Sequence, residues 1–502
     1  MRTLYRASKV HTLAAPSSGE WVLVDGRHVE RVGAGEPPRA ERVVELPGAT
    51  IVPGFVDSHV HLTGTGEHLR APALEQTRSK GDLLEALRRA AADSPDPVLL
   101  HGFDESAWPD RTLPGREELD RSVVQPAALL RVDGHVALAN AAALEGSGAA
   151  DRAGAERDGG ELTGRVTGTA LSALRRWFAM HQPERAVEEL QLAAASLAVS
   201  RGVTTVHEMS MPQERGIRDL EILMGHLHRL PVDVTTYVAT TDVAQVMDLG
   251  LTQIGGDLPV DGSIGARTAA VSGPYVDGAG TGRLAFEDDE LAEFFHAGHL
   301  AGLQVGVHAI GDAAIAQVVS TWERVYHSLD SRGRRHFRAR RHRVEHFEMA
   351  DPGLVERAAA LGLALSVQPA FDAAWGAPGG LYEQALGPSR AAAMNPFRDL
   401  VDRGLEVGAG SDSPITAMDP LAAIAALERH HDPAQHVSRL QALRICTLGS
   451  ARVARQDDKK GNLEPGKHAD FAAYERDPMQ VEDLVGLRPI LTVSLGREVF
   501  AA

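Results

Sequence analysis

Ile51-Val-Pro-Gly-Phe-Val-Asp-Ser-His-Val-His61 is an apolar, β-branched run that ends in two histidines. Because side chains alternate across a strand, His59 and His61 project from the same face. Two neutral imidazoles side by side at a strand end can share one divalent cation. A lone His-x-His pair is weak evidence, so its meaning depends on whether other strand ends supply further ligands.

Further strand-like runs follow, and helix-like runs separate the later ones. The eight predicted strands end near His61, Glu208, Tyr237, Asp261, His308, His346, Gln368 and Asp412. Eight strands that alternate with helices predict an α/β fold, the (β/α)8 TIM barrel. The predicted helices of the later part are Asp288–Leu300, Asp312–Leu329, Asp351–Leu361 and Pro396–Arg403, with Asp312 and Asp351 as N-caps.

The two ends of the chain contain short strands and tight turns, too few at either end for a separate sheet. We expect residues 1–50 and 455–502 to pair into a small β-sandwich beside a barrel of residues 51–454. Residues 67–195 are too many for one strand–helix connection. They are predicted to be an insertion after the first strand, placed over the barrel mouth, where loops carry function.

Composition excludes several classes of protein. A hydrophobic content of 43% over 502 residues supports a large core, and the net charge of −17 disfavours a nucleic-acid partner. Neither a signal-peptide pattern nor a membrane-spanning run is apparent. We expect a cytoplasmic enzyme with a small-molecule substrate and no nucleic-acid or membrane partner. The oligomeric state stays open, with a homodimer as one candidate.

Later strand ends supply the further ligands. His308 ends the fifth predicted strand, His346 the sixth and Asp412 the eighth. A barrel directs all its strand carboxyl ends to one mouth, so these residues should converge with the first histidine pair. Imidazole and carboxylate ligands favour one or two Zn²⁺ ions, with Mn²⁺ or Fe²⁺ as alternatives.

This ligand set suits hydrolysis. A bound cation makes hydroxide available near neutral pH and polarises the carbonyl under attack. Asp412 is placed to act as general base, taking the proton of the water and passing it to the leaving amine. His308 or His346 could stabilise the oxyanion if it does not bind the metal.

Seven motifs together resemble the amidohydrolase superfamily, in particular its YtcJ-like (amidohydrolase-3) branch. They are Pro53-Gly-Phe-Val-Asp-Ser-His-Val-His, Val132-Asp-Gly-His-Val-Ala-Leu-Ala-Asn, Asp261-Gly-Ser-Ile-Gly-Ala-Arg-Thr-Ala, His308-Ala-Ile-Gly-Asp, Arg343-Val-Glu-His, Ser411-Asp-Ser-Pro and Glu464-Pro-Gly-Lys-His-Ala-Asp. The resemblance implies a metal-dependent hydrolase on a distorted TIM barrel with a composite β-sandwich. It also implies metal-site roles for His59, His61, His308, His346 and Asp412.

The chain departs from the family pattern at one position. Many relatives carry a lysine that bridges two metals after carboxylation, where this chain has Asp257. A mononuclear site, with His346 acting on substrate, is the favoured expectation. Asp257 or Glu208 is the bridge if there are two ions, with Glu208 preferred.

Several residues are candidates for substrate contacts. His135 lies in the Asp-Gly-His motif of the insertion, and Arg267 follows the fourth predicted strand. Arg267 could hold a substrate carbonyl or carboxylate, or organise its own loop by a salt bridge. Trp108, Phe371 and Trp375 could line the mouth for a hydrophobic or aromatic substrate, or pack the insertion onto the barrel.

The leading hypothesis is a metal-dependent hydrolase of an amide, N-acyl or cyclic amide C–N bond. A deaminase of a nitrogen heterocycle at a mononuclear site is the alternative, distinguished by release of ammonia. A catalytically dead barrel with a binding or regulatory role is the distant alternative, which the presence of Asp412 and of the histidine pair disfavours.

Overall fold

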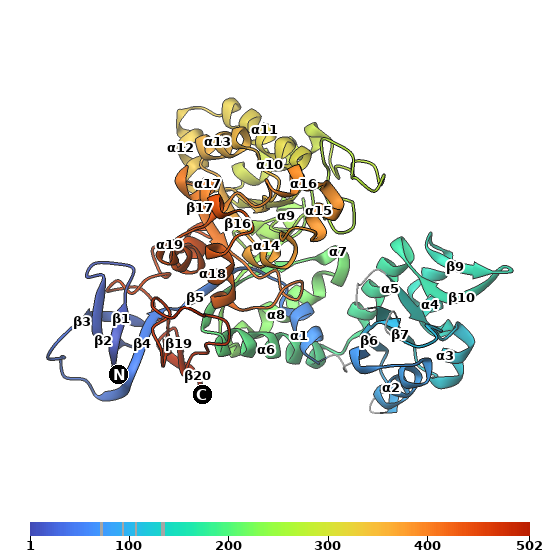
Figure 1. Ribbon diagram of the computed structural model, residues 1–502, viewed down its shortest axis with the longest axis horizontal. Coiled ribbons are helices and arrows are strands. Elements are labelled where there is room, and N and C mark those ends of the chain that lie inside the picture. The colour runs from blue at the N-terminus through green and yellow to red at the C-terminus, as the bar shows by residue number, and fades with distance from the viewer. Residues whose placement is uncertain (71–73, 93–94, 106–107, 132–135) are drawn as a thin grey trace. The chain divides into compact units, whose positions relative to one another are not determined.

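The computed structural model describes residues 1–70, 74–92, 95–105, 108–131 and 136–502. The chain divides into two compact units, each described here by itself (Figure 1). One unit contains Met1–Leu62, Ala195–Ser210 and Leu227–Ala502, and the other contains Thr63–Ala194 and Met211–His226. Helices and strands alternate over several sheets, which confirms the mixed α/β class.

In the first unit, two sheets of parallel strands follow one another. One has the order β12-β11-β5, with β5 at Phe55–Val60, β11 at Val203–Ser210 and β12 at Asp233–Val238. The other has the order β13-β14-β15-β16-β17, with these strands at Gln253–Ile254, Gln304–Ala309, Arg343–His346, Ala364–Val367 and Glu406–Ala409. Backbone hydrogen bonds join the sheets at both outer strands, from His61 to Ser413 at 3.0 Å and from Gly255 to Val238 at 2.7 Å.

Burial explains the composition of these strands. Every residue of β5, β11 and β15 is buried, including their histidines and acidic residues. Parallel strands are covered on both faces and therefore read as nearly continuous apolar runs. A polar side chain inside such a strand needs a partner, so each one is either structural or part of a site.

Helices follow most of these strands. Those of the first unit are α9 (Val243–Asp248), α10 (Asp288–Leu300), α11 (Asp312–Ser328), α12 (Ser331–Arg340), α13 (Pro352–Leu361), α14 (Pro369–Trp375), α15 (Leu381–Leu386), α16 (Pro388–Ala391), α17 (Phe397–Asp402), α18 (Pro420–Glu428), α19 (Arg439–Arg444) and α20 (Ser450–Val453), while α6 (Glu184–Ser200) crosses the unit boundary. Asp351 caps α13 as expected, by accepting from Leu354 N. The predicted cap Asp312 is wrong, because Gly311 holds the N-cap and Asp312 accepts from Ser272 N instead. Within the described residues, no helix combines the length and apolar character needed to cross a membrane.

The fourth predicted strand is interrupted before its expected end near Asp261. β13 stops at Ile254 because Gly255 and Gly256 turn the chain with φ of 83° and 63°. Pairing with β14 resumes beyond this turn, where Pro259 forms a parallel bridge with His308 and Val260 N–H donates to the His308 carbonyl at 3.0 Å, next to the expected end at Asp261. A Cβ on Gly255 would lie 2.0 Å from the Gly306 carbonyl oxygen of β14. This close turn is followed directly by Asp257, so it sets where that carboxylate lies.

Both chain ends enter one seven-stranded sheet of order β20-β19-β18-β4-β1-β2-β3 (Figure 1). Its strands are β1 (Arg2–His11), β2 (Ser18–Asp25), β3 (His28–Gly33), β4 (Arg42–Pro53), β18 (Phe471–Tyr474), β19 (Leu491–Ser494) and β20 (Arg497–Ala501). A core that includes Val22, Ile51, Phe471 and Val493 holds the two ends together. Because β4 leads into β5 across a single residue, this sheet anchors the start of the histidine strand.

The second unit has a sheet of its own, of order β6-β7-β8-β10-β9. These strands are β6 (Val98–Phe103), β7 (Ala127–Arg131), β8 (Ala137–Ala139), β9 (Ala155–Asp158) and β10 (Glu161–Val166). The accompanying helices are α1 (Leu62–Arg70), α2 (Lys80–Ala92), α3 (Arg116–Ser122), α4 (Ala141–Ser147), α5 (Gly168–His181), α7 (Pro212–Arg215) and α8 (Ile217–His226). Apolar clusters around Leu129 and around Leu174 give this unit its own core.

Gly255→Ala should lower the free energy of unfolding by about 2 kcal/mol or more, since the added methyl group meets backbone and φ is positive. The measurement is urea unfolding followed by circular dichroism. Gly250→Ala is the matched control, because Gly250 also has positive φ but has open space around it. Equal losses in the two variants would contradict the close-approach explanation.

Candidate metal centre

Ligand-type side chains from five strands meet at one place in the first unit. His59 lies in β5, His308 in β14 and His346 at the end of β15, while Asp257 follows β13 and Asp412 follows β17. Each position lies at or just beyond the carboxyl end of its strand, and His61 follows β5 directly. The predicted convergence of His59, His61, His308, His346 and Asp412 is therefore present in the structure.

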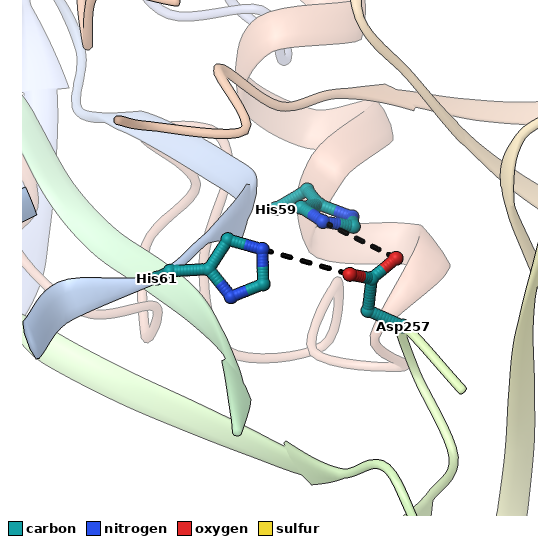
Figure 2. A group of neighbouring side chains, drawn as sticks. All are labelled: His59, His61 and Asp257. Carbon is teal, nitrogen blue, oxygen red and sulfur yellow. Dashed lines mark ion pairs between the residues drawn. The ribbon is translucent and has the colours of Figure 1, made fainter. Parts of the chain in front are cut away.

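Asp257 lies at the centre of this group. Figure 2 shows its carboxylate facing His59 and His61, with Oδ1 3.8 Å from His59 Nε2 and Oδ2 3.6 Å from His61 Nε2. Oδ1 is also 3.0 Å from His308 Nδ1 and 3.3 Å from His346 Nε2. One carboxylate is thus shared by imidazoles from three different strand ends.

Asp412 supplies a second carboxylate next to the first histidine pair. Its Oδ1 lies 3.2 Å from His61 Nε2 and 3.5 Å from His59 Nε2. The backbone N–H of Asp412 donates to the His59 carbonyl at 2.8 Å, and its φ is 53°. A non-glycine residue in this left-handed region is strained, and such strain concentrates at functional sites.

Each of the four imidazoles turns one nitrogen inward and uses the other for support. The outer Nδ1 of His59 bonds Glu345 at 2.9 Å, that of His61 the Met209 carbonyl at 2.9 Å, and that of His346 Gln368 Oε1 at 2.7 Å. His308 is reversed, with Nε2 3.2 Å from the Gly262 carbonyl and Nδ1 facing inward. Metal-binding histidines characteristically have such outer partners, which fix the tautomer and the ring orientation.

The inward nitrogen of His59 decides the fit to a cation. His59 Nε2 is buried and has no hydrogen-bond partner in the described part of the chain. Leaving a buried nitrogen unpaired costs about 1–3 kcal/mol, which a metal bond would offset. The ligand atoms of His59, His61 and Asp257, of His59, His346 and Asp412, and of Asp257, His308 and His346 each lie within 4.8 Å of one another. The residues therefore fit divalent cations.

Charges in the group favour cation binding. Burial opposes the charged form of His61, but Asp412 and Asp257 together raise its pKa to about 10. Asp257 likewise raises the pKa of buried His308 to about 9. Burial also opposes ionisation of Asp257, yet the facing imidazoles hold its pKa well below the usual range. Without metal, protons therefore balance the two carboxylates, and a cation can replace them.

Arg343 supports the site through Glu345, which contacts His59, although the sequence interpretation gave Arg343 no role. Its guanidinium is fully buried and pairs with Glu345 through Nε at 2.5 Å and Nη2 at 2.8 Å. Glu345 in turn accepts from His59. The Arg-Val-Glu-His motif could have indicated this pair, because Arg343 and Glu345 are two positions apart in a strand and therefore project from the same face.

Glu208 has a structural contact in this structure. Its Oε2 accepts from the backbone N–H of Leu62 at 2.7 Å, so this carboxylate fixes the turn that follows His61. None of the candidate ligand groups found among the described residues includes Glu208, whereas Asp257 belongs to two of them.

The remaining predicted residues are placed as follows. Arg267 bonds Asp277 through Nε at 2.7 Å and the carbonyls of Ile264 and Gly265 through Nη1, which organises its own loop. Trp108 is buried in the core of the second unit and donates to the Thr77 carbonyl at 3.0 Å. His135 lies outside the described residues.

Two predicted aromatic residues lie next to the ligands. The Phe371 ring is nearly parallel to that of His346, with centroids 6.0 Å apart and planes at 12°. Trp375 packs against Phe371 at 4.6 Å and is only half-buried. Helix α14 therefore presents an apolar wall beside His346.

With this geometry in view, the comparisons with known proteins identify the family. The model of the amidohydrolase family matches residues 42–500. The chain belongs to the amidohydrolase family. The motif-based assignment is thereby confirmed, and the chain is a hydrolase.

Individual relatives of the amidohydrolase agree with this assignment. The YtcJ protein of Bacillus subtilis, described by name as an amidohydrolase, is 28% identical over 89% of this chain and 88% of its own. An N-substituted formamide deformylase of Arthrobacter pascens is 26% identical over 92% and 90%. A solved metal-dependent hydrolase from Pyrococcus horikoshii is 26% identical, with a TM-score of 0.82 over 96% of this chain and 99% of that one.

Glu345→Gln in the amidohydrolase should lower the free energy of unfolding by about 3–5 kcal/mol, because it leaves the buried Arg343 charge unpaired. Glu323→Gln is the control, since Glu323 pairs with Arg357 at the surface, where such a pair is worth about 1 kcal/mol or less. Chemical denaturation of both variants measures the difference. A loss of less than 1 kcal/mol in Glu345→Gln would refute the structural role of the buried pair.

Metal affinity of the amidohydrolase should rise with pH. Because the raised pKa values keep His61 and His308 protonated in the metal-free protein, a cation has to displace these protons. The affinity for zinc should increase about tenfold per pH unit for each proton displaced, below about pH 9. Calorimetry in buffers of different ionisation enthalpy measures the released protons, and a pH-independent affinity would contradict the assignment.

Proposed function

We propose that this amidohydrolase cleaves a C–N bond of a small amide, N-acyl amine or cyclic amide at a centre of two divalent cations that share Asp257. The supporting observation is the orientation of the two carboxylate oxygens. Oδ2 lies 3.6 Å from His61 Nε2, whereas Oδ1 lies 3.0 Å from His308 Nδ1, 3.3 Å from His346 Nε2 and, at the longer distance of 3.8 Å, from His59 Nε2. A carboxylate between two sets of imidazoles is suited to bridge two ions, in place of the carboxylated lysine of many relatives.

Each ion has a ligand set in this proposal. His59, His61 and Asp412 would hold one ion together with Asp257, and His308 and His346 would hold the other with the same carboxylate. Imidazole and carboxylate donors favour Zn²⁺. This differs from the mononuclear site favoured from sequence, and it leaves Glu208 to its backbone contact.

The proposal includes the architecture that brings these ligands together. The eight parallel strands would close into a distorted (β/α)8 barrel of residues 51–454, consistent with the backbone bonds at both sheet junctions. The sheet of the chain ends would belong to a β-sandwich of residues 1–50 and 455–502, and residues 67–195 would be an insertion. All strand ends then share one mouth.

Bound cations would supply Lewis-acid activation of water and of the substrate carbonyl. Asp412 would take a proton from the attacking water and pass it to the leaving nitrogen. Burial opposes its ionisation, but His59 and His61 hold the pKa of Asp412 below its usual value, so the carboxylate is a base at neutral pH. Transfer by a positioned carboxylate typically contributes about 10²–10⁴-fold in rate.

The substrate class follows from the wall on α14. Phe371 and Trp375 offer an apolar surface beside His346, which suits a hydrophobic or aromatic group on the reacting amide. The relative named as an N-substituted formamide deformylase makes N-substituted formamides with aromatic substituents the first compounds to assay.

Asp412→Asn should retain most of the bound metal but lose about 10²–10⁴-fold in kcat, because the proton carrier is removed. Metal is measured by elemental analysis and turnover by release of amine. Asp289→Asn, at a highly exposed carboxylate, is the control and should keep full activity. Near-normal turnover in Asp412→Asn would exclude the proton-transfer role.

Two equivalents of zinc per chain at this centre are expected. One equivalent, with ammonia released from nitrogen heterocycles and no amide turnover, would favour the deaminase alternative instead. An Asp257→Ala variant, with its bridging oxygens removed, should lose one or both ions while it remains folded by circular dichroism. Full metal content in that variant would refute the bridge.

A further inference from the structure

A second group of ligand-type side chains lies outside the centre described above. Asp372 belongs to α14, and His430 and His431 come just after Arg429, the C-cap residue of α18. The side chains of His430, Asp372 and His431 are only 0%, 2% and 10% exposed. Two imidazoles and a carboxylate so deeply buried need a structural or chemical explanation, since such groups are rarely buried without full pairing.

The ligand atoms of this group converge on one oxygen. Asp372 Oδ1 lies 2.5 Å from His431 Nδ1 and 3.2 Å from His430 Nε2. The other oxygen, Oδ2, accepts from the His431 backbone N–H at 3.0 Å, which fixes the carboxylate. The two rings lie close together, with centroids 4.3 Å apart, and one ligand atom of each of the three residues lies within 4.8 Å of the other two.

One ring nitrogen of each histidine in this group has no hydrogen-bond partner among the described residues. The Nε2 atoms of His430 and His431 are buried and have no hydrogen-bond partner in the part of the chain that the structure describes. His430 Nε2 lies near Asp372 Oδ1 without forming a hydrogen bond to it. Of these two nitrogens, His430 Nε2 is the one that faces the Asp372 carboxylate, whereas His431 turns its other nitrogen, Nδ1, to Asp372 Oδ1. A buried, unpaired nitrogen next to a carboxylate is uncommon and points to an absent ligand at His430.

The outer side of His430 faces the Asp432 backbone. The Asp432 N–H donates to His430 Nδ1 at 3.0 Å, and the Asp432 carbonyl oxygen lies 3.2 Å from the same nitrogen. A cation at Nε2 would require the other tautomer, with the proton on Nδ1, in which the ring donates to that carbonyl and Nε2 has a free lone pair. A histidine N–H bonded to a backbone carbonyl is the usual support of a metal-binding imidazole.

We propose that Asp372, His430 and His431 form a second metal site, specific for a divalent cation of the zinc class. Asp372 Oδ1, His430 Nε2 and His431 Nδ1 are the ligand atoms, and water completes the coordination. Two imidazoles and a carboxylate suit Zn²⁺ better than Ca²⁺ or Mg²⁺, which take oxygen ligands. The site is structural, because its three ligands are buried and tie α14 to the segment after α18.

Its position gives the site a consequence for the catalytic centre. Asp372 is adjacent to Phe371, whose ring packs on His346. A cation at Asp372 would therefore fix the register of α14 and hold the Phe371 and Trp375 wall in place. This consequence rests on the proposed function, whereas the metal site itself does not.

The direct test measures zinc per chain in the full-length protein after removal of loosely bound metal. Wild type is expected to hold one equivalent more than Asp372→Asn and His431→Ala. His436→Ala is the matched control, since its imidazole bonds the His430 carbonyl and lies outside the ligand group, and it should keep that equivalent. Equal zinc content in wild type and both ligand variants would overturn the proposal. Asp372→Asn is nearly isosteric and keeps the test decisive if His431→Ala does not fold.

A second measurement separates this site from the catalytic centre. The combined variant His59→Ala and Asp257→Ala removes at least one ligand from each of the three ligand groups of the centre and leaves Asp372, His430 and His431 unchanged. Titrated with Co²⁺, it should still bind one equivalent with the visible absorption of a low-coordinate site, and adding Asp372→Asn should abolish that signal. Because activity plays no part in this readout, its failure is distinct from failure of the proposed function. Absence of the signal in the folded combined variant would overturn the second site.

Discussion

The buried pairing of Arg343 with Glu345 is the interaction on which the site depends. From β15, Arg343 also donates to the Ser58 carbonyl of β5 and bonds His207 of β11 at 3.0 Å. It therefore joins the two parallel sheets at their centre. Glu345, held by this arginine, accepts from His59 and directs its other nitrogen into the metal centre. A fully buried charge is tolerated here only because every part of it is paired.

Outer hydrogen bonds determine what the centre can hold. Carbonyl and carboxamide oxygens orient His61, His308 and His346, just as Glu345 orients His59, so all four inward nitrogens face carboxylates. Those carboxylates attract protons when no metal is present and cations when metal is available. The backbone places both carboxylates: Asp412 has a positive φ, and Asp257 follows the tight turn at Gly255 and Gly256.

Prediction from sequence succeeded where the signal was local. Helix α10 begins and ends where its periodicity indicated, and Asp351 caps α13 because its side chain reaches Leu354 N within one turn. Asp312 failed as a cap because Ser272, forty residues earlier, competes for its carboxylate. The interruption of the fourth strand was missed for a similar reason, since the Gly255 turn depends on its contact with β14.

The sequence by itself determined the family, the alternation of strands and helices, and five of the ligand-type residues, because strand-end histidines and their motifs are local patterns. The tertiary structure decided which carboxylate lies among them. From the sequence, Glu208 was preferred to Asp257 as the bridging carboxylate. In the structure, the glycine turn brings Asp257 to four imidazoles, while Glu208 accepts from the Leu62 N–H. Likewise, only folding brings Asp372 to His430 and His431 across some sixty residues, because such proximity arises from packing and not from spacing.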